Sequence, residues 1–212
     1  DIYATVAVPE YCFSGCGELA TVNIHNDLVS IDSHAFYGTS ALTSLTMKKV
    51  GAIADRAFME SGLTELTLPD CEVNVGLYAF ADCGALTSVK LGANTALVCE
   101  SSILRGSPVS TYTVAAGSDK YKVMQDGKLL VDKAGKKLVL AATGLPTALT
   151  INTSDYSEIA DGAFAGSDVV TISIVKGDGT VKIGDYAFEN CDDLLSVDIA
   201  PGAVTGIGVR AF

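Results

Sequence analysis

The stretch IADGAFAGSDVVTISI, residues 159–174, returns 24 residues later as IGDYAFENCDDLLSVDI, residues 183–199. Each copy has an isoleucine five residues before a phenylalanine, an alanine directly before it, and a serine or cysteine three residues after it. Three aliphatic residues in the spacing L-x-x-L-x-L close each copy, and their final alternation is typical of a strand with one buried face. A unit this short cannot bury its apolar face alone, so it needs neighbours of the same kind.

The same pattern runs through the whole chain. All seven phenylalanines fall on it, and the long gap between the fourth and the fifth holds a weaker copy with leucine at the aromatic position. We call this residue the anchor of its coil; the eight anchors are Phe13, Phe36, Phe58, Phe80, Leu104, Phe164, Phe188 and Phe212. A period of about 20–29 residues with strand-like leucines indicates a leucine-rich repeat solenoid. We therefore expect residues 1–212 to form a single solenoid of about eight coils.

The pattern also predicts how one coil folds. The L-x-x-L-x-L run forms a strand of a parallel, concave sheet, with aliphatic side chains inward and short polar side chains outward. A second inward aliphatic residue follows after a turn, as at Ile31. Three residues before the anchor, Asp55, Asp161 or Asp185 suits the N-cap of one short helical turn on an otherwise irregular convex side. The alanine before the anchor is expected where the backbones of two coils approach each other, and the phenylalanine ring fills the space beside it.

These segments resemble the BspA-type leucine-rich repeat of bacterial surface proteins, which reads roughly I-x-x-x-A-F-x-x-C/S-x-x-L-x-x-I-x-I. The resemblance covers nearly the whole chain and rests on eight copies in which the motif residues recur at the same relative positions. It implies a right-handed, strand-rich solenoid from secreted or cell-surface proteins, many of them regarded as adhesins. It brings no catalytic residues, because the shared positions are core positions. The chain departs from the pattern at Leu104, which replaces phenylalanine, and at Leu77 and Val209, which replace the capping residue.

Residues 115–144 interrupt the repeats. Within them, residues 121–142 alternate apolar and polar side chains around two turn signals, Asp126-Gly127 and Ala134-Gly135. Because Asp-Gly between alternating runs is a strong hairpin signal, we expect an inserted β-hairpin or three-stranded meander that projects from the solenoid. The residues expected on its buried face are Leu129, Val131, Leu138 and Leu140.

Lysines gather in this insertion, which holds six of the chain's fourteen basic residues. They are Lys120, Lys122, Lys128, Lys133, Lys136 and Lys137. One interpretation is that they keep exposed strand edges from pairing with other chains. The other is that they form a basic contact patch on an acidic body.

Charge and composition exclude some function classes. The formal net charge of −11 argues against nucleic acid, whose phosphates need basic clusters, and against an anionic membrane surface. The chain has no run of 18 apolar residues, the length that would indicate insertion into a membrane. The first residues lack the basic and apolar regions of a signal peptide, which is therefore absent or already removed.

The last coil stops at its anchor Phe212 without a following strand, so we expect the chain to be a segment of a longer protein. The strand expected at Leu194–Ile199 then has an open edge beside apolar residues. Open edges and large apolar patches favour contacts with other chains, which predicts weak end-to-end self-association.

Five of the six cysteines fit the repeat better than a disulfide framework, and Cys71 has no clear place in it. Cys16, Cys83 and Cys191 stand where other coils have serine or threonine, and Cys12 and Cys99 replace an alanine and an isoleucine. We therefore expect reduced thiols that act as small core residues, with Cys16, Cys83 and Cys191 buried. Coils about 4.8 Å apart would hold Cys16 and Cys83 roughly 14 Å from each other, whereas a disulfide needs Cα atoms within about 7 Å.

Catalytic and metal motifs are not found. The chain has no C-x-x-C pair, and His25 and His34 lack the spacing of metal ligands. It also lacks a G-x-S-x-G elbow, a P-loop and an H-E-x-x-H motif. We therefore expect neither an enzyme nor a cofactor.

The outward positions of successive strands remain as the candidate ligand-binding surface on the concave face. Most are serine or threonine, which also suit strand propensity and cross-strand hydrogen bonding without any ligand. The candidates are Thr21, Asn23, Ser44, Thr46, Glu65, Thr67, Ser88, Lys90, Thr111, Thr113, Thr171, Ser173, Ser196 and Asp198.

Three hypotheses about function follow. The first is an extracellular or cell-surface interaction module, adhesin-like, that binds a host, matrix or other surface protein through the concave face or the hairpin. The second is a carbohydrate-binding surface module, which is less favoured because sugar platforms use exposed aromatic rings and the concave face has almost none. The third is a spacer without a ligand within a larger surface protein.

Overall fold

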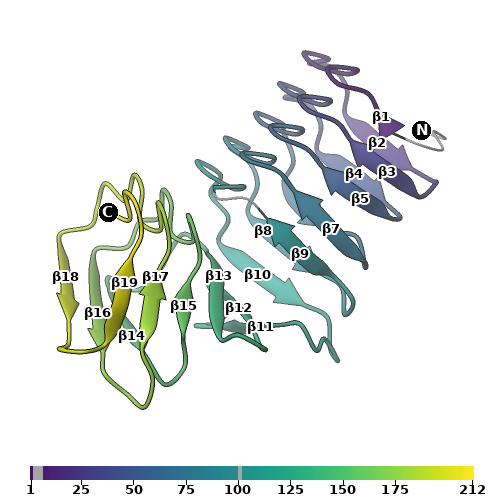
Figure 1. The fold of residues 1–212 in the computed structure, drawn as a ribbon. Helices are drawn as coiled ribbons and strands as arrows, with labels where there is room; N and C mark the ends of the chain where they lie inside the picture. The colour runs from purple at the N-terminus through teal and green to yellow at the C-terminus, as the bar shows by residue number, and fades with distance from the viewer. Residues whose placement is uncertain (2–6, 100–101) are drawn as a thin grey trace. The chain divides into compact units, whose positions relative to one another are not determined.

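The computed structural model describes residues 1, 7–99 and 102–212. The chain divides into two compact units, Asp1–Lys120 and Tyr121–Phe212. Each is a stack of coils built from parallel strands, which confirms the leucine-rich repeat solenoid (Figure 1). The described residues contain no helix, and thus none long and apolar enough to cross a membrane. That residues 1–212 form one continuous array stays a prediction.

The 1–120 unit has two strands in most of its coils. The strands of the L-x-x-L-x-L runs form what we call the first sheet: β2 (Thr21–Ile24), β4 (Ser44–Met47), β6 (Glu65–Thr67), β8 (Ser88–Leu91) and β10 (Thr111–Val114). The second aliphatic positions, which the sequence analysis did not assign to strands, form a second sheet in the order β1 (Ala7–Val8), β3 (Leu28–Ile31), β5 (Val50–Ile53), β7 (Glu72–Val75) and β9 (Ala96–Cys99). The core lies between these two sheets and the turns that carry the anchors.

The 121–212 unit repeats this plan. Its first sheet consists of β14 (Ala148–Asn152), β16 (Thr171–Val175) and β18 (Ser196–Ile199). Its second sheet has the order β11 (Tyr121–Met124), β12 (Leu129–Asp132), β13 (Lys137–Ala141), β15 (Glu158–Ile159), β17 (Val181–Ile183) and β19 (Val204–Ile207).

The phenylalanine anchors stack in two columns. The rings of Phe13, Phe36, Phe58 and Phe80 follow one another with centroids 5.0, 4.9 and 5.2 Å apart and planes within 6°. Phe164, Phe188 and Phe212 stack at 4.8 and 5.0 Å, with planes 18° and 4° apart. Such aromatic contacts contribute about 0.5–1.5 kcal/mol each beyond the burial of their area. The columns explain why this position carries phenylalanine in seven of the eight coils.

The alanine that precedes six of the eight anchors lies where two turns meet, as the sequence predicts. Ala35, Ala57 and Ala79 are fully buried. The backbone N–H of Phe36 donates to the carbonyl of Ala57 at 2.7 Å, and that of Phe58 donates to Ala79 at 2.8 Å. A larger side chain at the alanine position would hold the turns apart.

The predicted helical turn with an aspartate N-cap is wrong. Each anchor instead lies in a tight turn of hydrogen bonds three residues apart, such as Ala57 N–H to Ala54 carbonyl. The aspartate side chains bond the following coil rather than their own: Asp55 Oδ1 accepts from the Leu77 N–H at 2.9 Å, Asp161 Oδ1 from Asp185 at 2.8 Å, and Asp185 Oδ1 from Val209 at 2.7 Å. The reason is geometric, because stacked coils bring the N–H one repeat later closer than a donor within the same turn.

The meander is present but does not project. Its strands β11, β12 and β13 are antiparallel, as predicted, yet β13 also pairs in parallel with β15 and so becomes part of the second sheet. The predicted buried residues are buried, and so are Leu130 and Val139. Both faces of β12 and β13 are therefore covered, whereas a projecting hairpin would expose one.

The cysteine predictions hold only in part. The described cysteines are all free, and Cys83 is buried and Cys191 half-buried. Their thiols donate to the carbonyls of Phe58 and Phe164, at 3.2 and 3.0 Å, and burial raises the pKa of both. Cys12 and Cys16 are exposed, so the expectation of buried core thiols is wrong there. Within the described part of the chain, the turn that holds Cys12 and Cys16 has a neighbouring turn on one side only. The side chain of Cys99 lies outside what the structure describes.

Candidate functional site

The fourteen candidate residues lie at outward positions of the first sheets, and none of them is buried. The strand registers bring them together in short rows. In the 1–120 unit these rows are Thr21 with Ser44, Asn23 with Thr46, Glu65 with Ser88 and Thr111, and Thr67 with Lys90 and Thr113. In the 121–212 unit they are Thr171 with Ser196 and Ser173 with Asp198. Their role in binding stays a prediction.

The first sheet of the 1–120 unit is interrupted. β4 pairs with β2 and β6 pairs with β8, but within the described residues no backbone ladder joins β4 to β6. The two coils stay joined at the preceding turn, where the Gly62 N–H donates to the Thr39 carbonyl at 3.1 Å. The strands therefore separate while their turns remain in contact.

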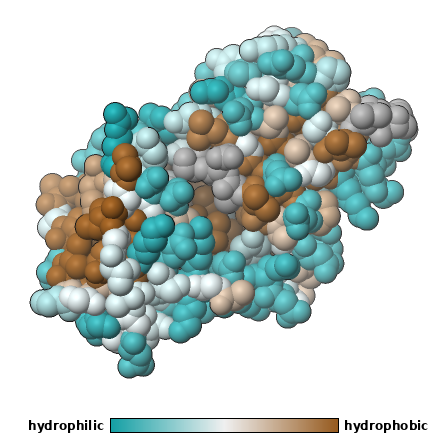
Figure 2. Space-filling model, in the orientation of Figure 1, coloured by the Kyte–Doolittle hydropathy of each residue, from teal (hydrophilic) through white to brown (hydrophobic). Residues whose placement is uncertain are grey.

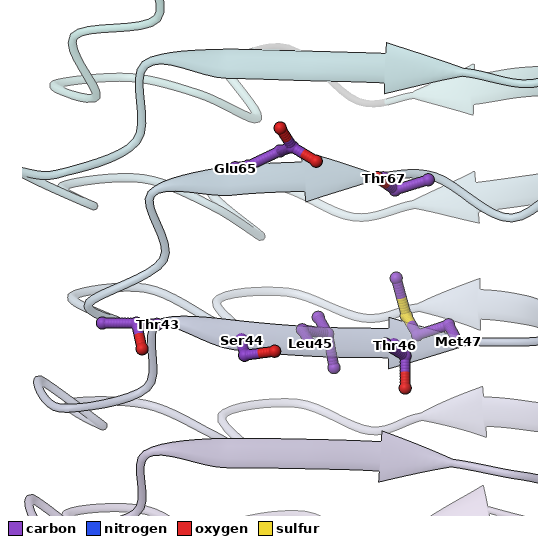
Figure 3. Close-up of a pocket in the computed structure, with 7 residues that line it drawn as sticks. All are labelled: Thr43, Ser44, Leu45, Thr46, Met47, Glu65 and Thr67. Atoms are coloured by element: carbon purple, nitrogen blue, oxygen red, sulfur yellow. The ribbon is translucent and has the colours of Figure 1, made fainter.

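A hollow of about 400 Å³ lies over this break (Figure 3). Its walls are residues 43–47, from β4 and the residue before it, and Glu65 and Thr67 from β6. The inward-facing Leu45 and Met47 are only half-buried, whereas Leu66 of β6 and Leu68 directly after it are buried. The hollow thus combines an apolar floor with a rim of hydroxyl groups and one carboxylate.

Two side-chain contacts position the rim. The Lys90 Nζ atom lies 2.6 Å from Glu65 Oε2, and the Thr46 hydroxyl donates to Asn23 Oδ1 at 2.7 Å. Both members of the ion pair are about half exposed, at 48% and 46%, so the pair contributes at most about 1 kcal/mol. A ligand can therefore displace either partner with little loss of stability.

Four of the sequence candidates, Ser44, Thr46, Glu65 and Thr67, line this hollow. Thr43, Leu45 and Met47 were not among the predicted site residues. Leu45 and Met47 occupy inward positions, which the repeat pattern assigns to a closed core. Only the half-burial of Leu45 and Met47 in the folded chain marks them as reachable from outside.

The lysines of the meander are partly used within their own unit. Lys128 Nζ donates to the Thr143 carbonyl at 3.0 Å, and Lys136 Nζ to the Ser154 carbonyl at 2.7 Å. Lys137 forms an ion pair with Glu158 at 2.8 Å. These contacts join the meander to the coil that follows it, which weakens the case for a basic contact patch.

No group of three or more His, Cys, Asp or Glu side chains capable of holding a metal occurs among the described residues. The first-sheet face offers hydrogen bonds, one ion pair and an apolar floor. These are the interactions with which a protein surface binds a ligand.

The chain belongs to the BspA type Leucine rich repeat region family, which matches in six copies over residues 6–120 and 146–212. The unmatched residues between these ranges include the three strands of the meander. The family identification on the repeat pattern is confirmed. No curated protein matches the sequence.

Solved structures of low sequence identity share the fold. A leucine-rich repeat protein from Eubacterium ventriosum is 16% identical, with a TM-score of 0.63 over 97% of this chain and 68% of its own. The pneumococcal vaccine antigen PcpA is also 16% identical, with a TM-score of 0.60 over 91% of this chain and 56% of its own. A leucine rich cell surface protein from Faecalibacterium prausnitzii is 22% identical, with a TM-score of 0.51 over 92% of this chain and 45% of its own. The chain thus spans about half the length of two of these proteins.

Proposed function

We propose that this chain is a non-enzymatic interaction module of an extracellular or cell-surface protein, and that it binds a protein ligand through the first-sheet face of residues 1–120. The observation that carries the proposal is the hollow at the β4–β6 break, which is lined by four predicted site residues. Surface location is supported by the family and by the name of the Faecalibacterium prausnitzii protein.

The chemistry of the hollow favours a protein ligand. An apolar side chain can enter over Leu45 and Met47, while peptide groups on either side reach the hydroxyls of Ser44, Thr46 and Thr67. A buried apolar anchor within a polar rim is the usual arrangement of a protein interface. Carbohydrate binding is supported less, because none of the fourteen candidates is aromatic.

The test is binding of the biotinylated chain to an array of purified extracellular proteins and, in parallel, to a glycan array. Thr46→Arg and Thr67→Arg would place a long cation in the hollow, and we expect each to weaken binding to a protein hit at least tenfold. Asn74→Arg, on exposed β7 of the second sheet, is the matched control and should leave binding unchanged.

Two outcomes would contradict the proposal. Hits on the glycan array alone would indicate the carbohydrate-binding alternative. A protein hit that Asn74→Arg weakens as much as Thr46→Arg would place the interface elsewhere. If neither array gives a hit, the spacer hypothesis gains support.

A further inference from the structure

The backbone adopts a left-handed conformation two residues before each described anchor. Eight residues occupy this position: Tyr11, His34, Arg56, Tyr78, Ser102, Gly162, Tyr186 and Arg210, with φ between 49° and 62°. Glycine is the residue best suited to such backbone, and Gly162 demonstrates that the turn accepts it. Six of the eight nevertheless carry tyrosine, histidine or arginine. Since these large side chains do not help the backbone adopt this conformation, their presence points to a use of the side chains themselves.

In the 1–120 unit four of these side chains, Tyr11, His34, Arg56 and Tyr78, follow one another on successive coils. Together with Tyr37 and Arg105, which each directly follow an anchor, they form what we call the turn ridge. The Tyr11 and His34 rings stack at 4.8 Å, and the edge of Tyr37 meets His34 at 5.7 Å. The Cζ atoms of Arg56 and Arg105, from the coils before and after, lie 5.2 and 5.6 Å from the Tyr78 ring centre. The ridge therefore collects tyrosine and arginine, two of the residue types that dominate binding energy at protein interfaces.

A second hollow, of about 280 Å³, opens on this ridge between Arg56, Met59, Tyr78, Asp82 and Arg105. Two arginines and one aspartate line it, on a chain whose net charge is −11. The Arg105 Nη1 atom donates to the Tyr78 hydroxyl at 3.3 Å, which holds one guanidinium in place. Because the guanidinium fork matches the two oxygens of a carboxylate, the group that fits this hollow is a carboxylate beside an apolar stem on Met59.

We propose that the turn ridge is a second docking surface, separate from the first-sheet face, for a protein partner that inserts a glutamate or aspartate side chain between Arg56 and Arg105. The arrangement of the rings selects protein over sugar. A pyranose needs an open ring face, whereas the two guanidinium groups lie over the Tyr78 ring at the hollow. Five successive coils at about 4.8 Å also extend the ridge over roughly 19 Å, which suits a peptide segment.

Nuclear magnetic resonance of the whole 212-residue chain tests this with acetyl-glutamate N-methylamide as the probe. We expect saturable shifts of the Arg56 and Arg105 Nε–H signals, half complete at low-millimolar concentration. Acetyl-glutamine N-methylamide, which lacks the charge, should give none. Arg56→Gln should weaken binding at least fivefold and Arg56→Lys less, since lysine keeps the charge but loses the fork. Arg210→Gln is the matched control, because Arg210 occupies the same left-handed position in the 121–212 unit.

The same titration with methyl glucuronide distinguishes a sugar carboxylate from a protein one. Tenfold tighter binding of the glucuronide would overturn the proposal in favour of an acidic glycan. Absence of saturable shifts with the glutamate probe, or equal shifts at Arg210, would also overturn it. Because none of these variants touches the β4–β6 hollow, failure here leaves the proposed function of the first-sheet face to its own test.

Discussion

The carboxylate of Asp161 fills the space that a side chain at Gly184 would need. A Cβ atom on Gly184 would lie 2.4 Å from Asp161 Oδ1 and 2.6 Å from the Asp161 backbone nitrogen. The same relationship joins Asp55 to Gly76 and Asp185 to Gly208, each at 2.4 Å from the carboxylate. An aspartate that bonds the next coil therefore requires glycine at the facing position one repeat later.

Gly184→Ala should destabilise the chain by about 1–3 kcal/mol, because the added methyl group overpacks a closed contact. Asp161→Ala in the same chain should restore only part of this loss, since the backbone nitrogen still lies in the way. Urea unfolding followed by circular dichroism measures both. Gly135→Ala is the control: no atom lies within 4 Å of its Cβ position, so it should change stability little. Equal effects of Gly184→Ala and Gly135→Ala would contradict the interpretation.

Truncating an anchor inside a phenylalanine column should lower the free energy of unfolding far more than truncating the anchor at the end of the column. Phe58 is fully buried between Phe36 and Phe80, and we expect Phe58→Ala to lower the free energy of unfolding by about 3–5 kcal/mol. Phe212 stacks only on Phe188 and is 51% exposed, so Phe212→Ala should cost clearly less. Similar losses for the two variants in urea unfolding would mean that the columns do not stabilise the fold.

The sequence predicts best those features of the fold that depend on the burial of apolar side chains. The phenylalanine columns, the buried alanines and the inward strand positions follow from apolar periodicity, because each coil must cover its neighbours. The direction of a polar side chain is not fixed in this way. Asp55, Asp161 and Asp185 have the right type for a cap, but stacked coils offer a closer donor. A signal for this was present: glycine follows each of them one repeat later, at Gly76, Gly184 and Gly208.

The break that forms the hollow has no such signal. The coil of Phe58 has one residue fewer between its anchor and Leu63 than the coil of Phe36 has before Leu42. The same shortening follows Leu104 and Phe164, where the strands remain paired. Separation of β4 from β6 therefore depends on packing between whole coils, which spacing alone does not encode. A turn position with left-handed backbone is also not recognisable from the sequence when tyrosine or arginine, rather than glycine, occupies it.

Stability should fall above pH 10 because of Tyr112. Burial raises the pKa of this tyrosine above its ordinary value of 10.0, so the folded chain keeps the phenol proton where the unfolded chain loses it. The contribution of Tyr112 is therefore fully present below about pH 10 and decreases as the pH rises above it, by up to about 1.4 kcal/mol per pH unit. Tyr112→Phe should reduce this slope in urea titrations between pH 9 and 11. Tyr11→Phe, at an exposed position, is the control, and an unchanged slope in Tyr112→Phe would contradict the assignment.

The 212-residue chain should self-associate through the face formed by β18, β19 and the last residues. Leu195, Ile207, Val209 and Phe212 are 82%, 56%, 63% and 51% exposed there. Figure 2 shows the apolar surface over this end of the 121–212 unit. Within the described residues β18 pairs only with β16 and β19 only with β17, so each has an open edge. Apolar side chains beside open edges favour pairing with another chain.

Sedimentation velocity over a hundredfold concentration range measures this association. We expect the weight-average sedimentation coefficient to rise with concentration, and Val209→Lys to suppress the rise because the added charge would be desolvated at the contact. Val29→Lys is the matched control, since Val29 is 65% exposed on β3 of the other unit, and it should leave the rise unchanged. A sedimentation coefficient that stays monomeric throughout, or an equal effect of both substitutions, would mean that this face does not mediate contact between chains.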